Sequence, residues 1–397
     1  MLIEFLLPCS VFVLCYNNLK KWRLLIVVSE RSAKRRIVYF DWFRALLPIA
    51  IIWIHILPKS DFWNMSLVSE AQHNFVYVTD GILRFSVPIF MMMTGALILN
   101  PRKPFDYKNF LKKNTLRLAI IFVVWAAFYA IIEYFLSGSD LRAVLAGLFG
   151  NWNYHLWYLL LTLAVYLMAP VLRKICEDRK VLEITLIISI LFCFALPTFK
   201  DFLVVLLSAS SGMNQWFMGV TDGLILGLNH IQIYFEFKFF VFFLLGYFLA
   251  TEEIPKKWRY RIYTIGVLAL ILSGIYQIIR YSFTGEIWSG SIGENINLLV
   301  LVSSASLFLL MKNLLKKKKL VPKLIQEMSK NSLGIYLIHA FFVALLYKTI
   351  FANFDWVYGL TWWGTGLLKI CLTVAIYLSS FMFTWLMRRI PVLKRLV

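Results

Sequence analysis

The stretch Arg36–His55 reads RIVYFDWFRALLPIAIIWIH, and it joins a long apolar run to a few polar side chains. A helix of about 20 apolar residues crosses the ~30 Å hydrocarbon core of a bilayer. Similar runs recur along the whole chain, so the sequence predicts an all-α membrane protein with about ten transmembrane helices. The expected spans are Phe40–Leu57, Leu83–Leu99, Leu116–Leu136, Leu156–Leu172, Val181–Pro197, Ile231–Ala250, Ile262–Tyr281, Ile296–Met311, Leu333–Phe351 and Trp363–Met387.

The basic residues indicate how the chain is oriented in the membrane. Its 397 residues carry a formal charge of +20, and 60% of them are hydrophobic. Lys and Arg gather in alternate loops, and the positive-inside rule therefore places both termini in the cytoplasm. This distribution argues against a nucleic-acid-binding surface and predicts a multi-pass protein of the plasma or inner membrane. The basic segments are Lys20–Arg36, Arg102–Arg117, Arg173–Lys180, Lys256–Arg261, Lys312–Lys330 and Arg388–Arg395.

One membrane domain with two flanking segments is the simplest division of the chain. We expect residues 37–390 to form the membrane domain and residues 391–397 a basic cytoplasmic tail. Residues 1–36 combine an apolar segment with a basic cytoplasmic linker. The apolar part, Leu2–Tyr16, is only about 15 residues long. It therefore lies in the membrane interface or forms a short extra span.

Metal and soluble-enzyme motifs are missing from the sequence. There is no His pair at metal-ligand spacing, no glycine-rich phosphate loop and no nucleophile-elbow serine. The five cysteines lack the close pairing of a zinc or redox site. We therefore predict no metal and no disulfide framework. The cysteines are Cys9, Cys15, Cys176, Cys193 and Cys371.

The first span carries the best candidate site. Arg44 and His55 are eleven residues apart, which on an α-helix is roughly 16 Å along the axis and within about 20° of the same direction. Asp41 lies three residues before Arg44 and can pair with it. The predicted topology puts Asp41 and Arg44 near the cytoplasm and His55 in the outer half, where an imidazole can accept a hydroxyl proton. The alternative is that all three merely anchor the helix ends.

These residues resemble the opening helix of the acyltransferase-3 family of membrane proteins, in which an Arg and a His stand eleven residues apart. Three further stretches are similar to motifs of that family: RFSVPIFMMMTGALIL from Arg84, HLWYLLLTLAVYLMAP from His155 and SLGIYLIH ending at His339. The second helix of the family usually ends in Ser-Gly, where this chain has Thr94-Gly95. The resemblance covers roughly Ile37 to Arg389.

The resemblance implies an O-acyltransferase that moves an acyl group, commonly acetyl, from cytoplasmic acyl-CoA to an extracytoplasmic cell-surface polysaccharide or related hydroxyl acceptor. By that analogy His55 is the catalytic base and Arg44 lines the donor channel. Arg84, at the outer start of the second span, binds acceptor or stabilises an oxyanion, or it snorkels to the interface. Glu133 orients His55 or balances Arg84.

The remaining candidates have equally plausible structural roles. Trp157 and Tyr158 line a substrate path, or they pack as ordinary membrane aromatics. His339 and Tyr336 lie two turns or less inside the cytoplasmic leaflet and bind the thioester arm, or they join helices by hydrogen bonds. In the basic stretch FLKKNTLRL (110–118), Lys113 and Arg117 share a helical face and receive CoA phosphates, or they serve topology and anionic lipid.

Two other functions fit some of these features. A small-molecule or amino-acid transporter also needs Arg, His and Glu along a membrane path. The other large class of membrane O-acyltransferases uses an intramembrane His, but the spacing from Arg44 to His55 argues against it.

Overall fold

The computed structural model describes residues 36–56, 67–137, 155–209, 219–220, 223, 227, 235–284, 297–318, 320–346 and 355–397. Nearly all of them belong to one compact unit, Val38–Val397. The expectations for the apolar segment and the linker before Arg36 lie outside the described residues.

Helices make up the regular structure of the described residues, which contain no strand, so the all-α prediction is confirmed. Within the described part of the chain, nine helices are long and apolar enough to cross a membrane, and the predicted sixth span coincides with a shorter apolar helix, α12. The main helices are α2 (Val38–His55), α3 (Glu70–Leu83), α4 (Ser86–Ile98), α5 (Tyr107–Phe110), α6 (Leu116–Ser137), α8 (Trp157–Glu177), α9 (Arg179–Ile190), α10 (Leu196–Ala209), α12 (Phe235–Thr251), α13 (Lys256–Thr284), α14 (Leu298–Leu315), α15 (Lys323–Leu346) and α16 (Trp362–Met387).

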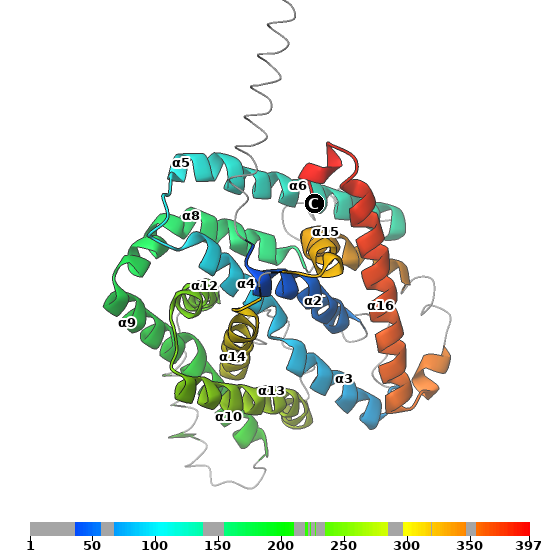
Figure 1. Cartoon of the computed structure of the whole chain (residues 1–397). Coiled ribbons are helices and arrows are strands. Elements are labelled where there is room, and N and C mark those ends of the chain that lie inside the picture. Colours follow the sequence, from blue (N-terminus) through cyan, green and yellow to red (C-terminus); the bar gives the residue numbers. More distant parts are fainter. Residues whose placement is uncertain are drawn as a thin grey trace, which may run out of the picture. The chain divides into compact units, whose positions relative to one another are not determined.

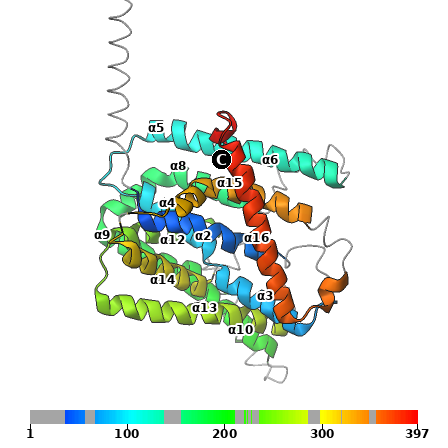
Figure 2. The ribbon, with the colours of Figure 1, turned by 45° about the vertical axis from the view of Figure 1, so that its right-hand side comes forward.

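Helices α2 and α4 lie at the centre of this unit, with α3, α6, α8, α9, α13 and α16 around them (Figures 1 and 2). Two glycines bring α4 and α12 into close contact. A Cβ at Gly95 would overlap the backbone of Phe243, and a Cβ at Gly246 would overlap the backbone of Met92. Small residues allow such close approach in membrane helix pairs, where packing is the main source of association energy.

Helix α2 also packs against α15, and α15 in turn packs against α16. The Tyr377 hydroxyl of α16 donates to the Ala45 carbonyl of α2 at 3.4 Å. This arrangement places the polar residues of the first span against the late motif that ends at His339.

Three predicted spans have different ends in the structure. The second span includes α3 and α4, so it begins at Glu70 and not at Leu83. The fifth span continues past Pro197 into α10, because the π-helical turn Leu191–Ala195 directly before it relieves the clash that a proline creates inside a helix. The ninth helix begins at Lys323, ten residues before the predicted Leu333.

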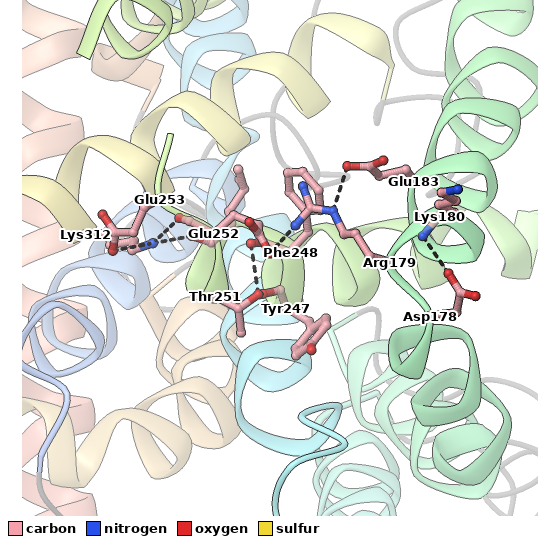
Figure 3. A network of polar contacts seen from close by, with 11 residues as sticks. Asp178, Arg179, Lys180, Glu183, Tyr247, Phe248, Thr251, Glu252, Glu253 and Lys312 are labelled. Atoms are coloured by element: carbon pink, nitrogen blue, oxygen red, sulfur yellow. Dashed lines mark hydrogen bonds and ion pairs between the residues drawn. The ribbon is translucent and has the colours of Figure 1, made fainter. Parts of the chain in front are cut away.

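A polar network ties α9, α12 and α14 together at the end of the bundle that is predicted to be cytoplasmic (Figure 3). The buried ammonium of Lys312 donates to the carbonyls of Leu249, at 2.9 Å, and Glu252, at 2.6 Å. Leu249 lies in the last turn of α12 and Glu252 directly follows that helix, so Lys312 caps its end. Arg179 pairs with Glu252, which fixes the start of α9 to the same turn.

The loop after α12 adds an exposed ion pair to this network. Lys316 contacts the Glu253 carboxylate at 2.7 Å, and this hydrogen bond lowers the pKa of Glu253 below its usual value.

Candidate functional site

A cavity of about 420 Å³ lies between α2, α4, α6, α8 and α15. Its walls are mostly apolar, and polar groups enter from four helices, α2, α4, α8 and α15. The polar and aromatic lining residues include Arg44, Thr94, Tyr158, Ser329, Lys330 and Tyr336. A mainly apolar chamber with a few fixed polar groups is typical of a small-molecule site.

Asp41 and Arg44 lie at the same end of α2 but make different contacts. The buried Asp41 accepts a hydrogen bond from the Ser329 hydroxyl at 2.6 Å. Arg44 is half-buried and lines the cavity. The guanidinium therefore provides positive charge to the cavity, while Asp41 joins α2 to α15.

Tyr336 connects the cavity to a group of histidines. Its ring lines the cavity beside Tyr158, with the two centroids 5.8 Å apart. Its hydroxyl donates to the carbonyl of His155, and its ring lies 5.9 Å from that of His339. Tyr336 is thus shared between the cavity wall and the residues behind it.

Three histidines form a cluster, His55, His155 and His339. The ring of His339 stacks on His55 with centroids 5.3 Å apart and an interplanar angle of 27°. The ring of His155 meets His339 edge-on at 5.0 Å. His339 and His155 are buried, with exposed fractions of 0% and 1%, whereas His55 is half-buried.

The hydrogen bonds of the cluster fix two imidazole tautomers. The Nδ1 of His339 lies 2.6 Å from the Tyr336 carbonyl, and the Nε2 of His155 lies 3.2 Å from the Leu337 carbonyl. A carbonyl only accepts, so each of these nitrogens carries the proton. The Tyr129 hydroxyl donates to the same Leu337 carbonyl at 2.6 Å. His339 is therefore held rigidly, with its Nε2 lone pair available.

The cavity and two ring contacts link Arg44 to His55. Arg44 and Tyr336 line the same cavity, Tyr336 lies against His339, and His339 lies against His55. His55 itself is not among the described residues that line the cavity. Arg44 and His55 therefore do not line one cavity together, and α15 lies between the cavity and His55.

The predicted start of the ninth span at Leu333 is wrong, whereas the depth of His339 and Tyr336 below the cytoplasmic surface stays a prediction. Since α15 begins at Lys323, His339 lies roughly 24 Å along that helix. The stack on His55 shows that the two imidazoles lie at the same level.

The expected start of the second span at Arg84 is wrong. Arg84 lies at the break between α3 and α4, in the middle of the stretch Glu70–Ile98. Asp80, one turn earlier, forms a fully buried ion pair with Lys369 of α16 at 2.7 Å. The positive charge of Arg84 also interacts with the Asp80 carboxylate.

Neither Asp80 nor Lys369 was predicted from the sequence as a site residue. A charged side chain within a membrane helix nevertheless marks a functional or structural role. Lys369 also lies 5.1 Å from the ring of Trp53, whose indole N–H donates to the Thr79 hydroxyl at 3.2 Å. Trp53 is two residues before His55. The pair thus supports the end of α2 that carries His55.

The other predicted residues divide between the cavity and elsewhere. Tyr158 lines the cavity, whereas Trp157 packs against Phe239 of α12 at 5.2 Å. Glu133 is exposed on α6. Lys113 and Arg117 are also exposed. Lys113 lies in the π-helical turn Leu111–Thr115, and that turn alters the i,i+4 spacing on which its shared face with Arg117 depends. Among the described residues, no three His, Cys, Asp or Glu side chains are arranged so that they could hold a metal ion together.

Comparison with known protein families agrees with the resemblance seen in the sequence motifs. A family model described as an acyltransferase domain matches residues 37–389, which is nearly the whole chain. No curated protein and no solved structure matches the chain.

Proposed function

Because the chain belongs to the acyltransferase-3 family, we propose that it is an acyl-CoA-dependent membrane O-acyltransferase. The acyl group, acetyl by expectation, passes from a cytoplasmic donor to a hydroxyl of an extracytoplasmic cell-surface glycan or related acceptor. The protein then works in the plasma or inner membrane with both termini in the cytoplasm.

The observation that carries this proposal is the cavity shared by Arg44 and Tyr336, together with the ring contacts from Tyr336 through His339 to His55. Arg44 gives the mainly apolar cavity a positive charge at one end, which suits an anionic donor with an uncharged pantetheine arm. The imidazole of His55 lies beyond Tyr336. A thioester held in the cavity is thereby directed toward the proposed base.

The reaction needs one proton acceptor. His55 removes the proton from the acceptor hydroxyl as the oxygen bonds to the thioester carbonyl carbon. The carbon–sulfur bond then breaks, and the proton passes from the imidazolium to the departing thiolate. Asp41, through Ser329, holds α2 and α15 in register.

The proposal assigns the remaining residues by location. Tyr158 and Tyr336 flank the donor arm. Lys113 and Arg117 attract its phosphates at the surface. Arg84 and Trp157 contact the acceptor or support its site, and Glu133 influences the outer end electrostatically.

A comparison of histidine variants tests this function. Purified protein in nanodiscs is given labelled acyl-CoA and cell-envelope glycan, and ester formation is measured for the wild type, His55→Ala and His73→Ala. His73 is the control, because it is a buried histidine whose ring packs against Tyr77 outside the cluster. We expect His55→Ala to lose acyl transfer and His73→Ala to keep it. Equal transfer by His55→Ala and the wild type would remove His55 from its role.

A further inference from the structure

The C-terminal segment Leu393–Val397, here called the tail, forms part of the cavity wall. Val397 lines the cavity together with Arg44 and Lys330. From this placement we propose that the tail is part of the donor site and that Lys394 and Arg395, with Lys330, bind the phosphates of a phosphate-bearing thioester. This inference rests on the proposed function and adds residues to its donor site.

Two side chains of α6 hold the tail in place. The indole N–H of Trp125 donates to the Leu396 carbonyl at 3.2 Å, and the Nε of Arg117 donates to the Arg395 carbonyl at 3.4 Å. Val397 packs on the hydrophobic cluster that contains Trp125 and Tyr129. The tail is therefore docked on the bundle, and Arg117 acts first as one of its anchors.

This docking gathers positive charge from three parts of the chain. Lys330 lines the cavity and is paired with Glu327 at 2.5 Å. The next residue, Asn331, accepts a hydrogen bond from Arg388 at 3.2 Å. Lys394 and Arg395 are exposed on the tail. Lys330 thus lines the cavity itself, and Arg395 and Lys394 lie two and three residues before Val397, which also lines it.

The shape and charge of this region match the two halves of a nucleotide thioester. An uncharged pantetheine arm suits the apolar chamber, whereas phosphates prefer exposed Lys and Arg, which form charge-assisted hydrogen bonds. Basic residues beside a membrane also attract anionic lipid headgroups. Both ligands offer phosphate, so the test must separate them.

Donor selectivity provides the test. The double variant Lys394→Ala/Arg395→Ala is assayed with acyl-CoA and with the matching acyl-pantetheine, which lacks phosphates. We expect the KM for acyl-CoA to rise roughly tenfold, while the KM for acyl-pantetheine stays unchanged. Lys256→Ala/Lys257→Ala is the control, because it removes the same charge from exposed positions of α13 that do not line the cavity. It should leave both KM values unchanged.

A second variant tests the docking of the tail without altering its charge. Trp125→Phe keeps an aromatic ring in the cluster but removes the N–H that holds Leu396. It should raise the KM for acyl-CoA more than that for acyl-pantetheine. An equal effect on both donors, or none on either, in both variants would overturn the proposal.

Two further measurements complete the experiment: one varies the lipid composition, and the other measures CoA binding directly. In nanodiscs of zwitterionic lipid alone, the donor-selective effect should persist; an effect seen only with anionic lipid would assign the tail to headgroups and refute the donor role. CoA binding is also measured by calorimetry. If the wild type binds CoA but transfers no acyl group, the proposed function fails, and weaker CoA binding by the double variant still supports the tail site. Equal CoA binding by both proteins would refute it.

Discussion

The imidazole ring of His339 lies on the ring of His55, with the centroids 5.3 Å apart. His55 is the last residue of α2, where the backbone no longer has a following helical turn to hold it. His339, by contrast, is fixed by its hydrogen bond to Tyr336 and by the edge of His155. The stack therefore orients the proposed base from a rigid neighbour.

Removal of this neighbour should slow the chemical step. His339→Ala leaves the His55 ring without its support, and we expect kcat to fall roughly tenfold to a hundredfold, because small misplacements of a catalytic group are costly. The KM for acyl-CoA should stay within about twofold. His339→Phe keeps a ring for stacking and should retain most of the activity. A change in donor KM alone, or equal losses in both variants, would contradict the positioning role.

Arg44 should act on donor binding. Arg44→Met removes the guanidinium from the cavity while keeping a long apolar side chain, and we expect the KM for acyl-CoA to rise roughly tenfold, the value of a hydrogen bond to a charged group. Arg261→Met serves as the control, because Arg261 is exposed and does not line the cavity. Steady-state kinetics check this result. An unchanged donor KM in Arg44→Met would show that the cavity does not hold the anionic end of the donor.

The buried ion pair between Asp80 and Lys369 should be strongly coupled. Lys369→Met leaves the Asp80 carboxylate buried without its ammonium partner, and the loss of stability should be about 3–5 kcal/mol. The double variant Asp80→Asn/Lys369→Met removes both charges and should recover part of that loss. Thermal unfolding in detergent gives the comparison. Additive losses in the double-mutant cycle would show that the two residues act independently.

Lys312 offers a test of the network in Figure 3. Lys312→Met removes the donor that serves the carbonyls of Leu249 and Glu252, and unsatisfied buried groups should lower stability by about 1–3 kcal/mol. Lys317→Met is the control, since Lys317 is exposed. Both variants lose one charge, so a difference in unfolding temperature reports the capping bonds. Identical temperatures for the two variants would show that the cap adds no stability.

Sequence alone predicted the helical class, because apolar length is a local property, while the role assigned to the spacing from Arg44 to His55 stays a prediction. It did not predict that α15 begins at Lys323. The start of α15, from Lys323 to Lys330, is too polar to resemble a membrane span, so its first turns lay outside the apolar run.

The partners of the site depend on contacts between distant segments. Asp80 and Lys369 meet only because α3 packs against α16. The apolar pattern of either helix does not indicate which helix it packs against. His155 begins a motif in the sequence, but its place beside His339 depends on how α8 and α15 pack. Glu133 is exposed on α6, and its role stays a prediction.

The central claim is that the acyl group crosses the membrane while CoA stays on the cytoplasmic side. Its most direct test uses proteoliposomes of known orientation with acceptor glycan inside, and acyl-CoA supplied to the cytoplasmic face with separate labels on the acyl group and on CoA. We predict acyl label on the enclosed glycan and no CoA label inside. CoA label in the lumen, or no acylated glycan with active wild-type protein, would contradict the account.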